Sequence, residues 1–137
     1  MTWEFMPLMN QGGRTLTIAV VEDNPRIREL LQEEIVDEGH IVLAYATAED
    51  FLRSYESDQA IDLVLMDLML PGMDGISCLK QLLQEDKIQP CPRVVIVTAL
   101  NDSEKRSEAL RLGADDYVLK PDLFHRLPEI LQAQMNH

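Results

Sequence analysis

The sequence predicts an α/β protein in which a parallel β-sheet is covered by helices on both faces. From Thr15 onward, short runs of apolar residues alternate with stretches whose apolar residues recur at helical spacing. The alternation recurs about five times without detectable sequence repetition, which is typical of successive strand–helix units. The chain has 137 residues, of which 46% are hydrophobic, so it is long enough for one domain with a sizeable core.

The first part of the chain contains three expected strands, separated by two expected helices. Each strand is a short apolar run bounded by polar or turn-forming residues. The runs are Leu16–Val21, Ile41–Ala46 and Ile61–Met66. Pro25 suits the first turn of the first helix, with Asp23 or Asn24 as its cap, and Gly39 marks the end of that helix. The second helix is expected from the spacing of Ala48, Phe51, Leu52 and Tyr55.

The second part of the chain contains two further expected strands, Val94–Val97 and Tyr117–Leu119, and three expected helices. The first helix is expected from the spacing of Ile76, Leu79, Leu82 and Leu83. The second, Asn101–Leu112, is only weakly amphipathic and is capped by Gly113. The last is expected from Leu123, Leu127, Ile130 and Leu131. Pro128 either starts a shorter last helix near Leu127 or kinks a longer one.

Residues 1–14 are expected to be an N-terminal extension, and residues 15–137 a single domain. The extension carries Glu4 early, lacks a basic start and has no continuous apolar stretch, so it is not typical of a signal peptide. No apolar run in the sequence is long enough to span a bilayer. The isolated pair Cys78 and Cys91 is expected to stay reduced and to have a structural role. These features predict a cytoplasmic protein without a membrane segment.

The formal net charge is -12, from 24 acidic and 12 basic residues. An acidic surface repels the phosphates of nucleic acids. We therefore expect no direct binding of nucleic acid, and expect cations or a partner with a basic patch instead.

Chemically active side chains directly follow several of the expected strands. Glu22 and Asp23 follow the first strand, and Asp67 follows the third. Thr98 follows the fourth strand, and Lys120 follows the last. Because the carboxyl ends of parallel strands lie at one edge of the sheet, these side chains are expected to gather where ligands bind in this class of fold.

The residue types at this edge favour a divalent cation and phosphoryl chemistry. Three carboxylates close together repel one another, and a small hard cation such as Mg²⁺, which prefers oxygen ligands and keeps several waters, relieves that repulsion. Asp23 and Asp67 are expected to bind the ion directly, and Glu22 through water. Asp67 can then act as a nucleophile toward phosphorus. Lys120 and the hydroxyl of Thr98 would stabilise charge on the transferred oxygens.

Each of these residues also has an ordinary structural explanation. Glu22 and Asp23 are common before a helix, and Asp67 is a frequent turn former. Thr98 suits a strand, and Lys120 is often a solvated charge. Residues of these types that each follow an apolar strand are better explained together by a shared site than by capping and solvation.

Four segments resemble the receiver domain of bacterial two-component response regulators. The segments are Glu22-Asp23-Asn24 for the acidic pair, Asp67–Gly75 for the phospho-acceptor loop, Thr98-Ala99 for the switch hydroxyl and Gly113–Pro121 for the last strand. No single motif is decisive, but their order and spacing are highly specific. The resemblance covers about Thr15 to Met135, nearly the whole chain.

The resemblance implies a flavodoxin-like (βα)5 fold with strand order 2-1-3-4-5. It also implies Mg²⁺-dependent transfer of a phosphoryl group to Asp67 from a sensor histidine kinase or a phosphotransfer protein. It adds the backbone carbonyl of Met69 to the metal ligands, and a cis peptide bond between Lys120 and Pro121. Such a domain is not an enzyme with external substrates, because it catalyses only its own phosphorylation and slow dephosphorylation.

The resemblance further implies a switch that couples Thr98 to Tyr117. On phosphorylation, Thr98 moves toward the phosphoryl oxygen and Tyr117 turns inward. The expected output face consists of the helix near Ser103–Leu112, the strand with Tyr117 and the final helix. Through this face the domain would control a protein partner or an effector domain, or form a homodimer. The alternative explanation for Tyr117 is a half-exposed strand aromatic.

Three other functions fit the sequence less well. A phosphohydrolase of the haloacid dehalogenase type usually has a second aspartate two residues after the nucleophile, where this chain has Met69. A flavin-binding domain needs a phosphate-cradling loop after the first strand, where Glu22 and Asp23 would repel phosphate. A pseudo-receiver, which binds partners without phosphorylation, does not need all of the site residues that this chain carries.

Overall fold

The computed structural model describes residues 14–55, 60–84 and 91–136, so residues 1–13 of the expected extension lie outside the described residues. The strands are β1 (Thr17–Val21), β2 (Ile41–Tyr45), β3 (Leu63–Met66), β4 (Arg93–Thr98) and β5 (Asp116–Leu119). The helices are α2 (Pro25–Asp37), α3 (Ala48–Tyr55), α4 (Gly75–Gln84), α5 (Ser103–Leu112) and α6 (Leu123–Met135), with a short 3-10 helix at Lys120–Asp122. Each expected element is present, with shifts of a few residues at its ends.

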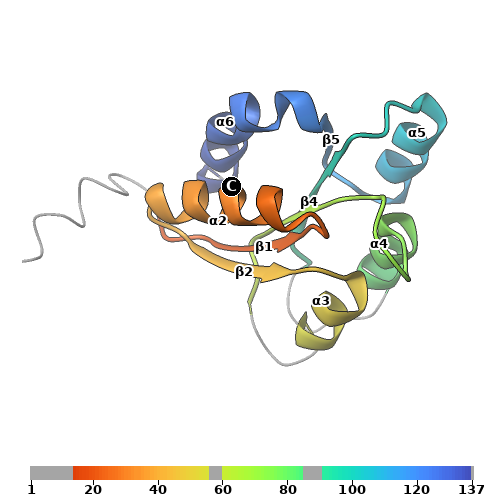
Figure 1. Ribbon diagram of the computed structural model, residues 1–137, viewed down its shortest axis with the longest axis horizontal. Helices are drawn as coiled ribbons and strands as arrows, with labels where there is room; N and C mark the ends of the chain where they lie inside the picture. The colour runs from red at the N-terminus through yellow and green to blue at the C-terminus, as the bar shows by residue number, and fades with distance from the viewer. Residues whose placement is uncertain (1–13, 56–59, 85–90, 137) are drawn as a thin grey trace, which may run out of the picture.

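The strands form one parallel sheet of order β2-β1-β3-β4-β5, which confirms the predicted fold class and strand order. Val21 at the end of β1 is in register with Tyr45 of β2 and with Met66 of β3. All carboxyl ends therefore lie at the same edge, which is on the right-hand side of Figure 1. Residues that directly follow β1 and β3 are brought together by this register alone.

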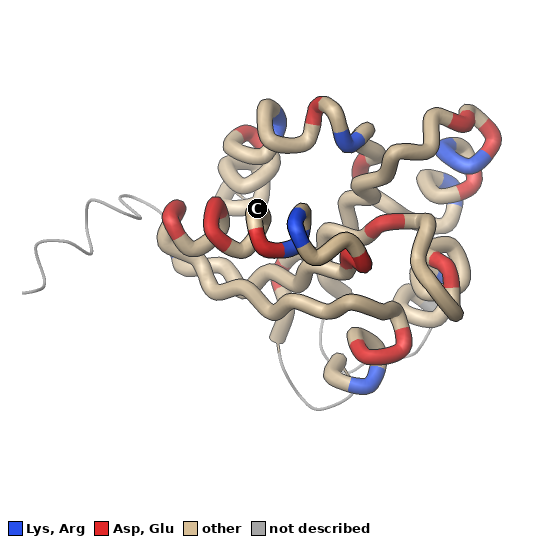
Figure 2. Tube along the Cα trace, viewed as in Figure 1, with Lys and Arg blue, Asp and Glu red and all other residues tan. Residues whose placement is uncertain are grey.

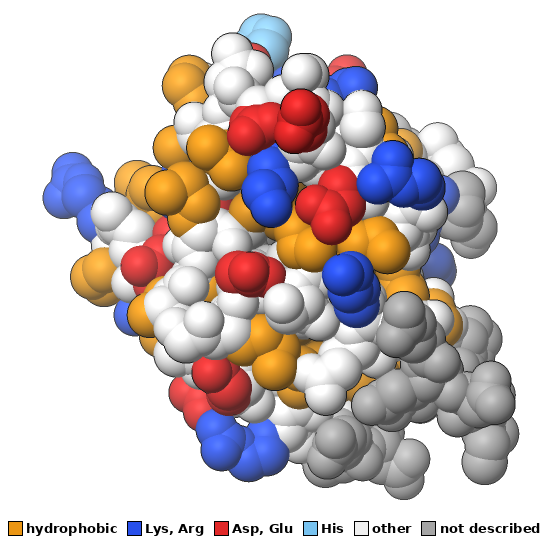
Figure 3. All heavy atoms as spheres, turned by 90° about the vertical axis from the view of Figure 1, so that its right-hand side faces the viewer, with side chains coloured by type: hydrophobic (Ala, Val, Ile, Leu, Met, Phe, Trp, Pro, Cys, Tyr) orange, Lys and Arg blue, Asp and Glu red, His pale blue; other side chains and the backbone are white. Residues whose placement is uncertain are grey.

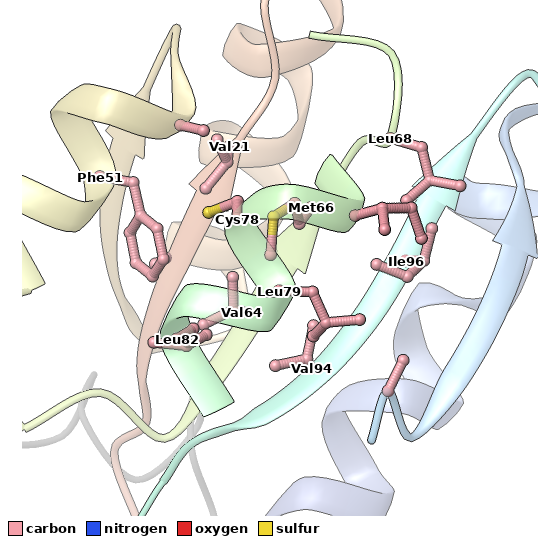
Figure 4. Close-up of a cluster of buried hydrophobic side chains, with 14 of the residues drawn as sticks. Val21, Phe51, Val64, Met66, Leu68, Cys78, Leu79, Leu82, Val94 and Ile96 are labelled. Atoms are coloured by element: carbon pink, nitrogen blue, oxygen red, sulfur yellow. The ribbon is translucent and has the colours of Figure 1, made fainter. Parts of the chain in front are cut away.

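Helices cover both faces of the sheet, and each face has its own hydrophobic core. One core lies between the sheet and α3, α4 and α5, and includes Phe51, Met66 and Leu79 (Figure 4). The other lies between the sheet and α2 and α6. Helix α5 buries only Ala109, as its weak amphipathic pattern predicts. Helix α5 therefore has few buried contacts that would oppose a shift of its position.

Helix boundaries follow from their capping residues. Asn24 caps α2, because its side chain accepts hydrogen bonds from Arg26 N at 3.0 Å and Ile27 N at 3.1 Å. Gly113 ends α5 in the left-handed region with φ of 119°, which favours glycine. Helix α6 continues through Pro128, so the longer of the two expected helices is formed. Pro128 is exposed and has no N–H to donate to the preceding turn.

The two cysteines are both free, as predicted, but only Cys78 is buried. Burial raises the pKa of the Cys78 thiol to about 12, so it remains protonated in the core beside Leu79 and Met66. Cys91 is exposed, so the expectation of a buried structural thiol is wrong there. Among the described residues, no helix has the length and apolar character needed to cross a membrane.

His40 is a buried histidine that joins β1 to the turn before β2. Its Nδ1 accepts a hydrogen bond from Leu16 N at 3.0 Å, and the residue is only 5% exposed. Burial lowers the pKa of His40 below its ordinary value, although nearby Glu38 and Asp62 act in the opposite direction. The neutral imidazole is the form that accepts this hydrogen bond.

This histidine predicts a loss of stability at mildly acidic pH. The unfolded chain takes up a proton more readily than the folded chain, so the stability is complete above about pH 6.5 and falls as the pH drops below that value. In His40→Asn the amide oxygen replaces Nδ1 as acceptor and does not titrate. We expect urea unfolding at about pH 7.5 and about pH 5.5 to show a smaller loss in the variant. Equal losses in both proteins would contradict this role.

Candidate functional site

Three carboxylates meet at the carboxyl edge of the sheet. Glu22 follows β1 and is 2% exposed, Asp67 follows β3 and is 3% exposed, and Asp23 is exposed at the rim. One oxygen from each carboxylate lies within 4.8 Å of the others. Figure 2 shows acidic positions near the right-hand ends of the strands, with a basic stretch of α2 close to them in this view. The predicted convergence of Glu22, Asp23 and Asp67 is thus present in the fold.

The sheet itself holds the backbone of these acids. Glu22 N donates to Tyr45 O at 3.0 Å, and Asp67 N donates to Val21 O at 3.1 Å. Both bonds continue the parallel ladder one residue past the strands, where the two side chains turn inward. The acids therefore stand on rigid backbone rather than on free loops.

Lys120 lies between the two buried carboxylates. Its Nζ is 3.0 Å from Glu22 Oε1 and 2.9 Å from Asp67 Oδ2, and its side chain is 18% exposed. Burial by itself would lower the pKa of Lys120, but the hydrogen bonds and charges of Asp67 and Glu22 outweigh it, so the pKa is raised. Lys120 therefore stays an ammonium ion in the site.

The expected cis peptide bond before Pro121 is absent, because no cis bond occurs among the described residues. Instead, Lys120 and Pro121 begin the 3-10 helix after β5, and proline suits this position because its φ is already close to helical values. Lys120 reaches Asp67 from this trans backbone.

The carboxylates exceed the positive charge that faces them. Burial raises the pKa of Glu22, and the charge of Asp67 adds to this, against hydrogen bonds from Asn24 N and Lys120. The Lys120 ammonium ion contacts the carboxylates of Glu22 and Asp67, and the neighbouring Asp23 carboxylate has no contact with it. A divalent cation fits this donor set, because the oxygens are hard ligands and the excess charge is negative.

Both carboxylate oxygens of Asp67 have partners, and its backbone packs against the start of α4. Oδ1 accepts from Met69 N at 3.1 Å, while Oδ2 contacts Lys120. Gly75 starts α4 against the backbone of Asp67, and its N–H donates to Leu68 O at 2.9 Å. A Cβ on Gly75 would lie 2.3 Å from Asp67 O, which is far inside contact distance. Glycine is therefore required for α4 to start this close to the backbone of Asp67 and Leu68.

Thr98 and Tyr117 both hold the backbone of Leu100, in the segment that follows β4. Thr98 is fully buried, and its Oγ1 accepts from Leu100 N at 3.2 Å. Tyr117 is 8% exposed, and its hydroxyl donates to Leu100 O at 2.5 Å. The half-exposed alternative for Tyr117 is therefore wrong. Burial, and then the charges of Asp102 and Asp67, raise the pKa of Tyr117, so its phenol remains a donor.

Two residues near the site had no role in the sequence analysis. Glu49 at the start of α3 accepts a hydrogen bond from Met73 N at 3.0 Å, which ties the loop after Asp67 to that helix. Arg28 in α2 donates through Nη1 to Glu22 O at 2.8 Å and to Asp23 O at 3.4 Å. Both look like ordinary surface charges on a helical wheel, and only the three-dimensional contacts single them out.

Figure 3 shows the side of the molecule onto which the carboxyl ends of the strands open. Acidic and basic side chains are interspersed over this side, with hydrophobic areas between them. The net negative charge of the chain is thus not spread as one continuous acidic surface here.

Comparison with known sequences gives one consistent family. The profile described as the response regulator receiver domain matches residues 18–132. Transcriptional regulatory protein AruR from Pseudomonas aeruginosa is 37% identical over 108 residues, which cover 76% of this chain and 43% of AruR. Two-component response regulator PhoP from the same organism is 36% identical over 118 residues, which cover 86% of this chain and 51% of PhoP. The chain spans about half the length of these relatives.

Solved receiver domains share the fold. The BeF3-activated DrrB receiver domain matches with a TM-score of 0.78 and 28% identity, over 90% of this chain and 100% of the DrrB chain. Response regulator TrrA from Thermotoga maritima, in complex with Mg²⁺-BeF, matches with a TM-score of 0.75 and 30% identity, over 88% of this chain and 99% of the TrrA chain.

Proposed function

The chain belongs to the response regulator receiver domain family, and on this premise we propose that it accepts a phosphoryl group on Asp67 in a Mg²⁺-dependent reaction. The observation that carries the proposal is the contact of Lys120 with both Asp67 and Glu22, beside Asp23. Fixed carboxylates next to a fixed ammonium ion form a site that binds a cation and stabilises negative charge as it develops.

In the proposed reaction, a carboxylate oxygen of Asp67 forms a bond to phosphorus. The bond from phosphorus to the nitrogen of a phosphohistidine, or to the oxygen of a small acyl phosphate, breaks, and its electron pair stays with the leaving group. Lys120 then pairs with a phosphoryl oxygen in place of the carboxylate, and the Thr98 hydroxyl donates to another. A bound Mg²⁺ supplies positive charge for the phosphoryl oxygens.

The proposed metal ligands are Asp23 and Asp67 directly, Glu22 through water, and the backbone carbonyl of Met69. The burial of Glu22 and Asp67 supports this set, because two buried carboxylates share a single lysine and Asp23 stands at the open rim. The solved structure of TrrA is a complex with Mg²⁺-BeF, which supports Mg²⁺ as the proposed cation.

We further propose that phosphorylation is read through the face formed by α5, β5 and α6. Thr98 and Tyr117 contact opposite ends of Leu100, so a shift of the Thr98 hydroxyl toward a phosphoryl oxygen releases Leu100 N and alters the start of α5. The single buried residue of α5 makes such a shift inexpensive.

The proposed partners follow from this role. A cytoplasmic sensor histidine kinase or phosphotransfer protein would donate the phosphoryl group to the receiver unit, residues 15–137. The face formed by α5, β5 and α6 would then control a downstream protein or effector domain, or pair with a second copy of the chain. The domain would turn over no external substrate beyond its own phosphorylation and slow dephosphorylation.

The test is phosphoryl uptake from acetyl phosphate with and without Mg²⁺. Intact-mass analysis is expected to show one added phosphoryl group in the presence of Mg²⁺ and a large loss of that species when EDTA is present. The reason is that the carboxylate cluster repels the incoming anion until a cation neutralises it. Equal uptake under both conditions would remove the metal from the proposed function.

A further inference from the structure

Asp23 differs from the other two acids of the site in how it is held. Glu22 accepts hydrogen bonds from Asn24 N and Lys120, and Asp67 accepts from Met69 N and contacts Lys120. Within residues 14–55, 60–84 and 91–136, the Asp23 carboxylate has no side-chain partner. The position of this carboxylate therefore depends on how firmly its backbone is fixed.

Arg28 is the side chain that holds this backbone. Its Nη1 lies 2.8 Å from Glu22 O and 3.4 Å from Asp23 O, so one nitrogen spans two successive carbonyls of the turn between β1 and α2. The Glu22 bond is partly buried, where a charged donor is stronger than at the open surface. Glu22 N is bonded to Tyr45 O on the other side, so the turn is fixed from both directions.

The helix dipole does not favour the placement of Arg28. It lies in the first turns of α2, where the helix dipole disfavours positive charge, and this first turn carries no acidic residue. Arg26, two residues earlier, carries the same charge and is exposed, and its guanidinium has no partner in the described part of the chain. Arg28 differs from Arg26 by its bonds to the acidic turn.

We propose that Arg28 is a positioning residue that fixes the Glu22–Asp23 turn and thereby raises the affinity of the carboxylate cluster for Mg²⁺. The inference rests on the proposed function, because it assumes that Asp23 is a metal ligand. Arg28 can change the affinity for Mg²⁺ in two opposite directions. As a nearby positive charge, Arg28 would weaken the binding of a cation, whereas as a fixed clamp on the ligand backbone it strengthens that binding.

The geometry favours the clamp over the charge. The guanidinium contacts carbonyl oxygens and not the carboxylates, and its charge lies at a partly solvated position where water and salt screen it. Loss of a group that orients a metal ligand typically costs about tenfold or more in metal affinity. We therefore expect Arg28→Met to bind Mg²⁺ about tenfold more weakly than the unaltered chain.

The experiment is calorimetric titration of the full chain with Mg²⁺, without phosphodonor and at constant ionic strength. Arg26→Met is the matched control, since it removes the same charge from the same helix, and its Mg²⁺ affinity is expected to stay equal or rise slightly. Arg28→Lys keeps the charge on a shorter side chain with one nitrogen, and is expected to recover part of the affinity. Thermal unfolding in EDTA separately records any change in the stability of the metal-free fold.

The outcomes separate this inference from the proposed function. Normal Mg²⁺ affinity in both Arg28 variants, or tighter binding in Arg28→Met, overturns the positioning role and leaves the metal site standing. No Mg²⁺ binding by the unaltered chain overturns both. If Arg28→Met does not fold, Arg28→Lys decides the matter, because its nitrogen lies one bond short of the position of Nη1, and an affinity equal to that of the unaltered chain would show that this contact with the two carbonyls is not needed.

Discussion

Asp67→Asn is expected to abolish phosphoryl uptake from acetyl phosphate in the presence of Mg²⁺. The amide has no anionic oxygen to attack phosphorus, although it is nearly the same size and can still accept from Met69 N. Intact-mass analysis should show the added phosphoryl group in the unaltered chain and none in the variant over the same time.

The matched control is Asp74→Asn, in the loop that follows Asp67. Asp74 Oδ1 accepts from Ser77 N at 2.8 Å at the start of α4, and asparagine serves equally well at such a position. This variant should fold and take up phosphoryl normally. Persistent uptake in Asp67→Asn would assign the acceptor to another residue, and loss in both variants would point to the loop rather than to the nucleophile.

Lys120→Ala is expected to fold but to lose the response of the face formed by α5, β5 and α6. Without the ammonium ion, two buried carboxylates face each other, so the metal-free variant should be less stable and Mg²⁺ should stabilise it by more than it stabilises the unaltered chain. A phosphoryl group would lack the cation that fixes one of its oxygens. Amide chemical shifts of α5 and β5, recorded before and after addition of Mg²⁺ and beryllium fluoride, measure the response.

Lys80→Ala is the control for charge, because Lys80 is an exposed lysine on α4 and the ion pairs with Glu22 and Asp67 are made by Lys120. It should keep the full set of shift changes. If Lys120→Ala shows the same changes in α5 and β5 as the unaltered chain, Lys120 is not part of the switch, whatever its effect on stability.

The site was predictable from sequence because its residues directly follow strands. Apolar runs fix where β1 and β3 end, and the parallel register then places Glu22 beside Asp67 without further information. Lys120 follows from the same rule at β5. The capping pattern also fixed helix starts to within a few residues, although Asn24 and not Asp23 proved to be the cap, which leaves the Asp23 carboxylate outside the helix.

Other features depend on contacts between distant residues and left no local pattern. His40 looks like a turn residue, and its burial comes from the hydrogen bond to Leu16 across 24 positions of sequence. Tyr117 directly follows two aspartates in a short strand, so its sequence context fits a half-exposed position equally well, and its burial becomes evident only from the hydrogen bond of its hydroxyl to Leu100 O. The 3-10 turn at Lys120–Asp122 likewise had no counterpart in the sequence pattern.

Because Gly75 has no Cβ, the start of α4 packs directly against the backbone of Asp67, and the two are expected to move together. Since α4 begins in van der Waals contact with the peptide of Asp67, any recoil of that peptide during phosphoryl transfer must be shared by ten residues of helix. A graft of the acceptor loop into another protein would therefore have to include α4. A loop grafted without this helix would lack the packing that supports the backbone of its aspartate.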